Sequence, residues 1–527
     1  MGSGAAGLRA AIEAKRNKSD VLIASKSEIG YNSCSLYSEG AFSAPIEGLT
    51  PQRYFELTLE TGRGINNQQL LRVLAEEAAR RMLELRDFGV RLRVWRGGGS
   101  FSDTSVSPLT SGFGIVKPLR DAAEKLGVRF LPKTFISKIL VMERRVFGVA
   151  GFNLDGDFVV ISARSVVLAC GGAGQIYLRN DNPSGITGDG YALALDAGVP
   201  LVDMEFVQFF PVGSDEEELP LYMIPLVRSK YPEICEMGTL VNAKGVDLLG
   251  RYFQGGKLHR VSSKARDELS RVLLKELGDT GGVFLDLRRI PEALWEESEP
   301  LKIFKRYWLR GLRRDVLRVL PLTHHFMGGA EINERCETAV EGLYVCGENA
   351  GGVHGANRMG GNALTDAVVF GAIAGQGAAQ RARETTGERI GGDVVDEERQ
   401  RLLGFLRQDR GVKARDVKEE VQRLAWTSVG IIRSGRSLNE ALERIAEIRA
   451  LEDFVAEDAR QLMRVLEALN MIRVAETVAK SALTRDESRG AHFREDHPDQ
   501  MAEWVKNVVV EPRDGELKTR VKPASKL

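Results

Sequence analysis

A short stretch from His354 to Leu364 carries the side chains with the clearest chemical potential in this chain. Its single arginine, Arg358, has a planar guanidinium that can bind a carboxylate through two parallel hydrogen bonds. Its histidine supplies a neutral imidazole, and its glycines let the backbone lie close to a ligand. An apolar helix expected from about Asn362 offers free N–H groups to an electron-rich ring edge. The stretch therefore predicts a site for a carboxylate beside a bound ring system.

A second ligand-binding pattern opens the chain. Gly2, Gly4 and Gly7 form a GxGxxG turn that runs directly into an Ala-rich helix, and a short strand follows at 21–24. In a dinucleotide-binding fold such glycines allow a sharp turn and a close approach to the pyrophosphate. The strand that should precede them is missing, since only Met1 stands before Gly2. We expect a mis-assigned or trimmed start; the alternative is a genuinely short N-terminus with another segment in that strand's place.

The elements that must position these residues follow from periodicity. Apolar residues three and four apart predict helices from Pro51 to about Leu126, and long amphipathic helices from Asp396, after a charged linker near 391, to about Thr484. Residues 212–318 mix strands and helices with many charges. A hairpin turn is expected at 155–157. Strands are predicted at 128–131, 139–142, 146–152, 158–161 and 165–169.

Length and composition limit the class of protein. A prior of about 150 residues per domain predicts three units in 527 residues. Lys plus Arg and Asp plus Glu are equal at 73 each, so no global field attracts nucleic acid or an acidic membrane. The five cysteines have no CxxC pair or metal-like spacing, which argues against disulfides and cysteine-held clusters. Without a long apolar run or a secretory leader, the chain is expected to be soluble and cytoplasmic.

Five motifs together resemble one known family. They are GLYVCGE at 342–348, HGANRMGGNALTD at 354–366, ACGGAGQIY at 169–177, TGDG at 187–190 and ESRGAHFREDHP at 487–498. The chain is similar in these segments to the FAD-dependent flavoprotein subunits of succinate dehydrogenase and fumarate reductase, with L-aspartate oxidase as a close relative.

The resemblance implies an α/β fold with a split, doubly wound, Rossmann-like FAD-binding domain. An α+β capping domain is inserted in it, and a helical domain follows. The implied boundaries are 1–211 and 319–390 for the two FAD-binding parts, 212–318 for the capping domain, 396–490 for the helical domain and 491–527 for a C-terminal tail.

The resemblance also implies which residues bind FAD, with Glu348 holding the ribitol. Cys34 stands where respiratory members link a histidine covalently to FAD, so histidyl attachment is excluded and non-covalent FAD is expected. A thioether through Cys34 is the chemical alternative, but a small buried thiol is the commoner role. The expected cofactor-binding residues are Gly2, Gly4, Ala5, Gly7, Ser25, Lys26, Ser33, Cys34, Glu39, Gly40, Ala169, Gly171, Asp189, Glu348, Asn362 and Leu364.

Three further residues are implied to act on the substrate. Arg358 would hold a substrate carboxylate, His324 in the PLTHHFMGG segment would hydrogen-bond it, and Arg266 would deliver a proton. Adjacent histidines in a strand point to opposite faces, so one of His324 and His325 can meet the flavin. For Arg266 the alternative is a solvated charged helix face, and for His324 it is a satisfied core histidine.

The chain departs from the family in two places. Phe210 stands where the family has a second substrate-binding histidine. In the segment that should reload Arg266 with a proton, Tyr231 and Ile234 replace the relay Glu and Arg, unless Glu233 or Glu236 substitutes with a shift. Lost hydrogen bonds to a dicarboxylate are worth about 1.5–3 kcal/mol each. The natural substrate therefore need not be fumarate.

The prediction for function is a flavoprotein oxidoreductase that passes hydride between FAD and a carboxylate substrate, as the fumarate reductase or succinate dehydrogenase flavoprotein subunit. The resemblance implies an iron–sulfur partner protein, with a peripheral place at the inner face of the cell membrane through partners. Two alternatives remain. One is a soluble oxidase or dehydrogenase like L-aspartate oxidase, and the other is a catalytically impaired flavin-binding or scaffold subunit.

Overall fold

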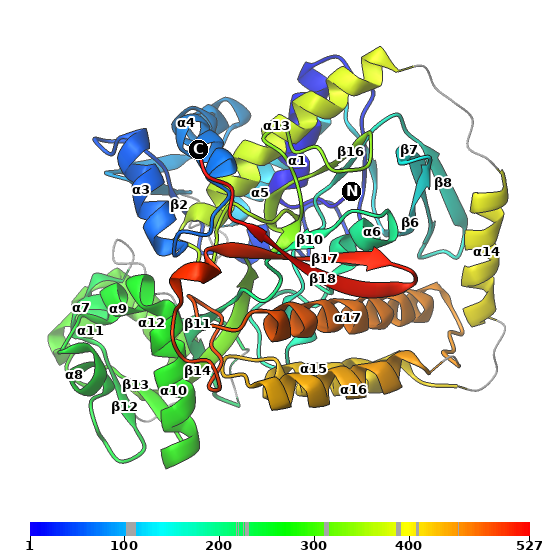
Figure 1. The fold of residues 1–527 in the computed structure, drawn as a ribbon. Helices are drawn as coiled ribbons and strands as arrows, with labels where there is room; N and C mark the ends of the chain where they lie inside the picture. The colour runs from blue at the N-terminus through cyan, green and yellow to red at the C-terminus, as the bar shows by residue number, and fades with distance from the viewer. Residues whose placement is uncertain are drawn as a thin grey trace. The chain divides into compact units, whose positions relative to one another are not determined.

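The computed structural model describes residues 1–101, 112–217, 219, 221–224, 226, 231–309, 316–385, 392–406, 411–451 and 453–527. Two compact units make up the chain (Figure 1). The larger contains Met1–Leu178, Asn182–Val207 and His325–Leu527, and the smaller contains Arg179–Asp181 and Gln208–His324. The predicted domain boundary near 390 lies outside the described residues.

The larger unit contains two pairs of parallel strands. β1 (Leu22–Ala24) pairs with β5 (Arg129–Leu131), and β9 (Val166–Leu168) pairs with β16 (Leu343–Val345). Met1 and Gly2 bridge the two pairs: the Met1 ammonium donates to the Val167 carbonyl at 2.7 Å, and the Gly2 amide donates to the Ala24 carbonyl at 3.0 Å. Met1 and Gly2 thus lie between the ends of β1 and β9.

Helix α1 (Ala5–Arg16) packs lengthwise on α13 (Asn362–Glu384), because α13 presents glycines at the contact. A Cβ added at Gly375 would lie 2.1 Å from the Ala10 carbonyl oxygen, and one at Gly371 would lie 2.7 Å from that of Ala6. Side chains there would push the helices apart. The larger unit also contains α2 (Cys34–Tyr37), α3 (Pro51–Thr61), α4 (Gln68–Glu84), α5 (Phe113–Lys125) and α6 (Asp189–Asp196), with short 3₁₀ turns at Leu85–Phe88, Gly174–Ile176 and Gly347–Asn349.

The expectation of helix throughout 51–126 is wrong in one segment. Between α4 and α5 the chain forms β3 (Leu92–Trp95) and β4 (Gly98–Phe101), which join β2 (Ala41–Ser43) in a small antiparallel sheet. Gly99 has a neighbour so close that a Cβ would lie 2.5 Å from the Phe42 ring. The glycines at 98 and 99 therefore allow β4 to lie close to β2 and β3.

The predicted hairpin at 155–157 is confirmed, and so are the strands around it. β6 (Thr134–Met142), β7 (Arg145–Asn153) and β8 (Phe158–Ser162) form an antiparallel meander. The Asn153 side chain accepts hydrogen bonds from the Asp155 and Asp157 amides and so fixes the turn between β7 and β8.

The helical segment near the C-terminus is confirmed, and its three helices between 414 and 484 lie side by side (Figure 1). Its apolar faces are buried and its exposed faces carry pairs of opposite charge, as the sequence pattern predicts. The helices are α14 (Gly392–Leu406), α15 (Ala414–Ser428), α16 (Gly435–Arg449) and α17 (Ala459–Thr484). Among the described residues, no helix combines the length and the apolar character needed to span a bilayer.

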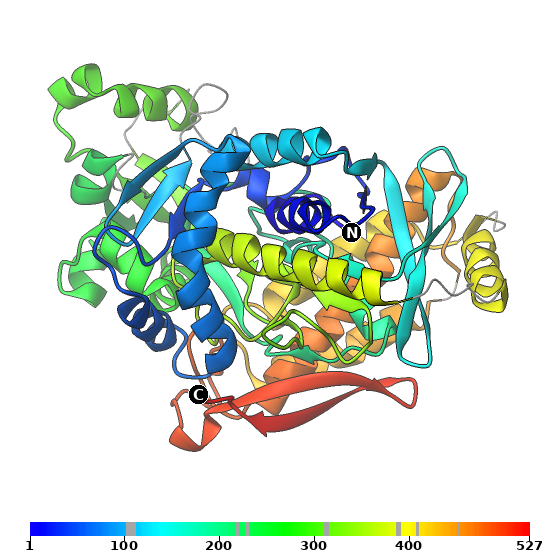
Figure 2. The same cartoon turned by 90° about the horizontal axis from the view of Figure 1, so that it is seen from above.

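Within the segment interpreted as a tail, residues 506–523 form a hairpin of β17 (Lys506–Arg513) and β18 (Glu516–Pro523), seen in red in Figure 2. β17 pairs with β10 (Leu201–Val202), which in turn pairs with β15 (Gly329–Ala330). Three consecutive valines, 508–510, are fully buried. The hairpin is part of the core of the larger unit because it extends this sheet.

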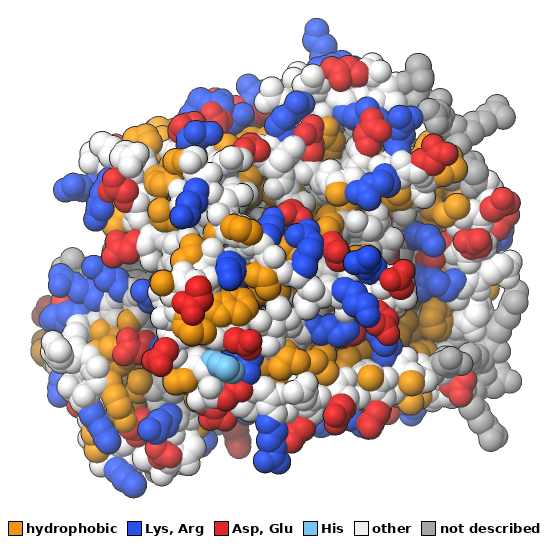
Figure 3. Space-filling view, viewed as in Figure 1, with side chains coloured by type: hydrophobic (Ala, Val, Ile, Leu, Met, Phe, Trp, Pro, Cys, Tyr) orange, Lys and Arg blue, Asp and Glu red, His pale blue; other side chains and the backbone are white. Residues whose placement is uncertain are grey.

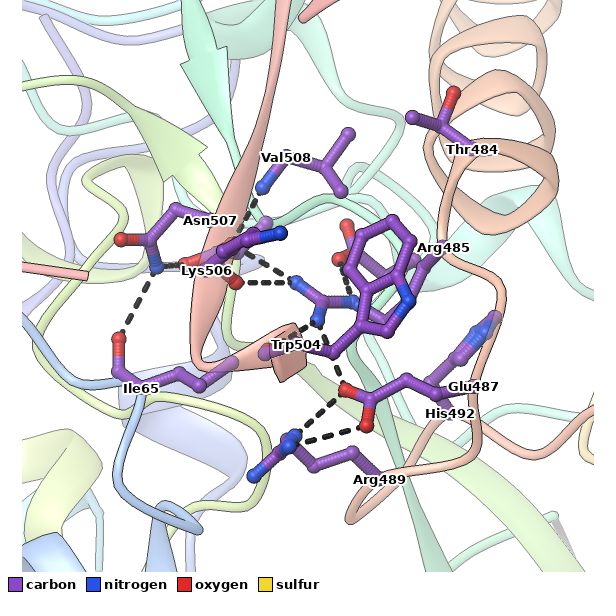
Figure 4. A network of polar contacts seen from close by, with 12 residues as sticks. Ile65, Thr484, Arg485, Glu487, Arg489, His492, Trp504, Lys506, Asn507 and Val508 are labelled. Carbon is purple, nitrogen blue, oxygen red and sulfur yellow. Dashed lines mark hydrogen bonds and ion pairs between the residues drawn. The ribbon is translucent and has the colours of Figure 1, made fainter. Parts of the chain in front are cut away.

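A buried ionic network ties the ESRGAH motif to this hairpin (Figure 4). Arg485 is fully buried and donates to Glu205 at 2.7 Å, to Glu487 at 3.0 Å and to the Lys506 carbonyl at 2.7 Å. Glu487 also receives two hydrogen bonds from Arg489. The motif is thus a structural junction between the end of α17 and the start of β17.

The smaller unit is an antiparallel sheet with helices on it. The strand order is β11 (Val207–Ser214), β14 (Val316–Phe326), β13 (Val283–Asp286) and β12 (Thr239–Asn242). Its helices are α7 (Pro232–Met237), α8 (Leu248–Phe253), α9 (Leu258–Lys264), α10 (Arg266–Thr280), α11 (Glu292–Glu297) and α12 (Glu299–Trp308). On the face of the molecule seen in Figure 3, basic and acidic side chains are interspersed, as the balanced composition predicts.

Candidate active site

The N-terminal glycine turn is pressed against the end of β9. Gly2 has φ +90°, and a Cβ there would lie 2.1 Å from the Ala169 carbonyl oxygen. A Cβ at Gly7 would lie 2.1 Å from the Gly2 carbonyl oxygen. At the start of α1, the Ala5 amide donates to Ser35 Oγ at 3.1 Å, and Ser35 Oγ lies 3.2 Å from where a Cβ of Gly4 would stand. Gly2 and Gly7 therefore have no room for a side chain. The turn contains four of the expected cofactor residues: Gly2, Gly4, Ala5 and Gly7.

Serines surround this turn. Ser25 follows β1, and its hydroxyl lies 3.0 Å from that of Ser3. Ser33 caps α2 by accepting from the Leu36 amide at 3.3 Å. Sequence reasoning missed Ser35; its place beside Ser33 and Cys34, both expected to bind the cofactor, is the available signal. Gly171, φ +83°, lies just after β9, and Glu39 and Gly40, φ +70°, lie just before β2.

Cys34 begins α2 and is half-buried, with its sulfur 3.5 Å from the Asn182 side-chain oxygen. Lys26 donates to Asp189 and to Glu467, each at 2.6 Å. Burial lowers the pKa of Lys26, but the charges of Asp189 and Glu467 outweigh it and raise that pKa above its ordinary value. Two expected cofactor residues, Lys26 and Asp189, thus pair with each other and with α17.

The GE pair at 347–348 places Glu348 against a strand end. Its carboxylate accepts from the Phe326 amide at 3.0 Å and lies 3.4 Å from Nδ1 of His325. A Cβ at Gly172 would lie 2.3 Å from Glu348 Oε1, so the carboxylate rests directly on bare backbone. His325, not His324, is therefore the histidine that faces Glu348.

Next to this pair lie two buried groups that are neutral near pH 7. Burial, with the charge of Glu348, raises the pKa of Asp366 to about 8, although Arg358 opposes the shift. Burial and the charge of Arg358 lower the pKa of His354 to about 3. Nε2 of His354 and Oδ2 of Asp366 are 3.9 Å apart. The sequence predicts a neutral imidazole in the HGANR segment, whereas it gives no sign of the protonated carboxyl.

The start of α13 is held by two neighbours. Gly361, φ +84°, precedes the helix, and Asn362 accepts from the Tyr54 hydroxyl at 2.9 Å and donates to Thr58 at 3.2 Å. Leu364 is buried in the first turn. Arg358 is 5% exposed, and its guanidinium donates to the Met359 carbonyl at 3.3 Å. A buried guanidinium beside a helix start suits an anionic ligand group.

Within the smaller unit, Arg266 and His324 both contact Phe210. The Arg266 guanidinium carbon lies 5.2 Å from the centre of the Phe210 ring, and the His324 ring centre lies 5.7 Å from it. Arg266 is the first residue of α10, and it donates to Gln208 and to the Ser262 carbonyl, each at 3.1 Å. Because Arg266 is buried, the alternative of a solvated charged face is wrong.

Asp181 is a further member of this cluster that the sequence did not reveal. Its Oδ2 lies 2.8 Å from Nδ1 of His324. The two residues are 143 positions apart, so no local spacing could have connected them.

In the segment expected to hold a proton relay, Tyr231 and Ile234 are buried, and Glu236 pairs with Lys257 at 3.1 Å. The Glu233 Oε2 atom is buried, with no hydrogen-bond partner among the described residues. Lys230, at the head of that segment, lies outside the described residues.

Comparison with known proteins agrees with this geometry. An FAD binding domain model matches residues 1–364, and a fumarate reductase flavoprotein C-terminal model matches residues 418–525. An uncharacterized FAD-dependent oxidoreductase of Methanocaldococcus jannaschii is 36% identical over 97% of this chain and 95% of that protein. A CoM/CoB fumarate reductase subunit of Methanothermobacter marburgensis is 33% identical over 97% and 96%. A solved structure of E. coli quinol fumarate reductase FrdA superposes with a TM-score of 0.88 at 27% identity, over 100% of this chain and 96% of that one.

The described residues fit FAD. Gly2 and Gly7 let the turn before α1 pack against Ala169 and against itself, where a side chain would collide, and a dinucleotide-binding turn has this tight shape. Two buried polar groups of the larger unit, the Asn349 amide nitrogen and the His354 ring nitrogens, have no hydrogen-bond partner among the described residues. Buried polar atoms of this kind are normally satisfied, so a polar ligand is the expected partner.

Proposed function

The chain belongs to the fumarate reductase and succinate dehydrogenase flavoprotein family, and we propose that it acts on a fumarate- or succinate-like dicarboxylate as the flavoprotein subunit of a larger complex. It is an FAD-dependent oxidoreductase with the fold of this family. When bound, FAD supplies hydride exchange with the carbon–carbon bond of the substrate.

The observation that carries the proposal is the cluster in the smaller unit of Arg266 and Phe210, which are buried, and His324, which is partly exposed. Arg266 donates hydrogen bonds to the neutral Gln208 side chain and Ser262 carbonyl, and the His324 imidazole contacts the Asp181 carboxylate. Arg266 and His324 both lie against the Phe210 ring. In this proposal Arg266 delivers a proton to the substrate carbon, and His324 orients and polarises a carboxylate. Exclusion of water from such a cluster strengthens both electrostatic contacts.

Arg358 is proposed as the clamp on a substrate carboxylate. It is a permanently charged, buried side chain, and a guanidinium fork binds a carboxylate through two hydrogen bonds. We further propose that the smaller unit is the capping domain and that 396–490 form the helical domain.

Phe210 sets the proposed specificity. Its ring supports Arg266 and His324 by contact but donates no hydrogen bond, and each charge-assisted hydrogen bond that a dicarboxylate loses costs about 1.5–3 kcal/mol. We therefore propose that fumarate is bound more weakly than in family members with a histidine at this place, or that a related carboxylate is the natural substrate.

The test is turnover of purified, FAD-loaded protein with reduced viologen as electron donor and fumarate as acceptor. We expect viologen oxidation well above the rate with free FAD, and its loss in Arg266→Gln. Arg271→Gln is the matched control, since Arg271 lies on the same helix, is half-buried and pairs with Asp267 at 3.9 Å. A rate no higher than that of free FAD would refute the assignment of fumarate as substrate.

The proposed partner is an iron–sulfur protein, through which any membrane contact would arise. Co-purification from the native source should yield iron and acid-labile sulfide with the chain. A yellow homomer without iron that forms peroxide from L-aspartate would favour the oxidase alternative instead.

Non-covalent attachment of FAD is proposed because Cys34 stands where respiratory family members carry the linking histidine, and its half-buried thiol lies 3.5 Å from the side-chain oxygen of Asn182. Acid precipitation should release all flavin into the supernatant. Flavin that stays with the denatured protein, and is lost in Cys34→Ser, would show a thioether instead.

A further inference from the structure

One face of α17 lies against the end of β1 and the turn at 187–189. Lys26 follows β1 by two residues. Its Nζ donates to Thr187 Oγ1 at 3.0 Å, to Asp189 Oδ2 at 2.6 Å and to Glu467 Oε1 at 2.6 Å. An ammonium group has three N–H donors, so these contacts use all of them. Lys26 therefore joins three segments that are distant in the sequence.

Both carboxylate oxygens of Asp189 also have protein donors. Oδ2 accepts from Lys26, whereas Oδ1 accepts from the Thr187 hydroxyl at 3.0 Å and from the Asn470 amide at 2.9 Å. The side chains of Lys26, Asp189 and Glu467 are 19%, 11% and 12% exposed. These ion pairs are therefore largely withdrawn from water, where screening by solvent is weaker.

Close packing brings α17 to this turn. Gly188 has φ +85°, and a Cβ there would lie 2.7 Å from Val474 Cγ2. A side chain at 188 would push the turn away from α17. Glu467, Asn470 and Val474 are three and four residues apart, so they share one face of the helix. That face gives the turn one carboxylate, one amide and one apolar contact.

The same cluster adjoins the glycine turn at the start of the chain. Ser25 precedes Lys26, and its hydroxyl lies 3.0 Å from that of Ser3 within the turn. The contacts of Lys26 thus fix the end of β1 beside a turn with the tight shape of a dinucleotide-binding turn. Since all three N–H groups of Lys26 are used by protein acceptors, its ammonium acts by holding these segments in place.

We propose that Glu467 and Asn470 are positioning residues for FAD, which act through Lys26 and Asp189. The role rests on the proposed assignment of Lys26 and Asp189 to the FAD site. Both of these lie in the part matched by the FAD binding domain model, whereas α17 lies in the part matched by the flavoprotein C-terminal model. The C-terminal helical segment thus contributes to cofactor affinity, because segments held in place lose little freedom when FAD binds.

The test is a fluorescence titration of FAD into apoprotein of the full chain. Loss of a group that orients a ligand-binding residue costs about 10- to 100-fold at metal sites, and we expect Glu467→Ala to raise the Kd for FAD about 10-fold. Glu467→Gln keeps an acceptor oxygen for Lys26 and should recover part of the affinity. Asn470→Ala removes one hydrogen bond and no charge, and should raise the Kd about 2- to 12-fold. This milder variant decides the question if Glu467→Ala does not fold.

Arg473→Ala is the matched control. Arg473 also lies on α17, but it pairs with Asp196 at the end of α6 rather than with Lys26 or Asp189. It therefore joins the same two helices, and loss of this exposed pair should change the Kd at most about twofold. If Arg473→Ala weakens FAD binding as much as Glu467→Ala does, α17 acts only by docking on α6 and the proposal fails.

A double-variant comparison tests whether Glu467 acts through Lys26. We expect Lys26→Met to weaken FAD binding by itself, and Glu467→Ala to cause no further loss in that background. A further loss as large as in the wild-type background, or an unchanged or lower Kd in Glu467→Ala alone, would overturn the proposal. An unchanged Kd in Lys26→Met would remove Lys26 from the FAD site and the proposal with it. The titration contains no substrate, so its result is independent of whether fumarate is the natural substrate.

Discussion

Replacing Asp366 by asparagine should make the protein progressively more stable than the wild type as the pH rises. Burial, together with the charge of Glu348, raises the pKa of Asp366 to about 8, against 3.8 for an ordinary exposed aspartate. The folded protein therefore holds a proton at Asp366 that the unfolded chain has released. Stability from this group is fully present below pH 3.8 and is lost as the pH rises toward 8.

The size of the effect follows from the linkage relation. One proton bound on folding changes the free energy of unfolding by about 1.4 kcal/mol per pH unit, so ionisation of Asp366 should cost the wild type about 4 kcal/mol between pH 5 and pH 8. Asparagine has nearly the same shape and no charge, so the variant escapes this cost. The difference between variant and wild type should therefore grow by about 4 kcal/mol across this range.

The assay is equilibrium urea unfolding, followed by tryptophan fluorescence at pH 5, 6, 7 and 8 with the same excess of FAD throughout. Taking the difference at each pH removes the contribution of other titrating groups such as His354. Asp496→Asn is the control: hydrogen bonds from Arg494 lower the pKa of Asp496, so its carboxylate stays charged and its difference from wild type should not vary with pH. A difference for Asp366→Asn that stays constant within about 1 kcal/mol would refute the argument that Asp366 is protonated.

Three further changes test other parts of the structure. Gly7→Ala puts a Cβ 2.1 Å from the Gly2 carbonyl oxygen, and overpacking of about 1–3 kcal/mol should weaken FAD binding about 5- to 150-fold in a fluorescence titration of apoprotein; unchanged affinity would contradict the role of the turn. Arg358→Gln should raise KM for the carboxylate about 10- to 150-fold at unchanged FAD content, through loss of about 1.5–3 kcal/mol of charge-assisted bonding; an unchanged KM would remove Arg358 from the site. Arg485→Met removes the guanidinium that opposes the rise in the pKa of buried Glu205, and urea unfolding should show a loss of about 3–5 kcal/mol, whereas a neutral or stabilising result would show that the network adds no net stability.

The elements that sequence predicts correctly are those with a local cause. The hairpin at 155–157 follows from an Asn side chain that bonds to amides within its own turn, and the turn at 2–7 has a local contact that excludes a side chain at Gly7, next to the Gly2 carbonyl. The helices at 414–484 follow from apolar residues at helical spacing. Each of these signals lies within one turn or one element.

The errors have a non-local cause. The hairpin of β17 and β18 was not predicted, because most residues of β18 are exposed and β10, the partner of β17, lies some 300 positions earlier in the chain. The small sheet of β2, β3 and β4 likewise depends on pairing across the intervening helices. Strand pairing of this kind is decided by partners that no local window contains.

The sequence by itself determined the family-type motifs, the glycine turn, the arginine at 358 and the histidine pair at 324 and 325, because these depend on residue type and short spacing. Only the tertiary structure decided which partner each of them has. In the structure His324 contacts Asp181 and His325 lies beside Glu348. Asp366 is buried, and its raised pKa keeps the carboxyl protonated near neutral pH. The physical reason is that the charge state and orientation of a side chain depend on its burial and on neighbours from distant segments of the chain. Local sequence patterns do not reveal burial or such neighbours.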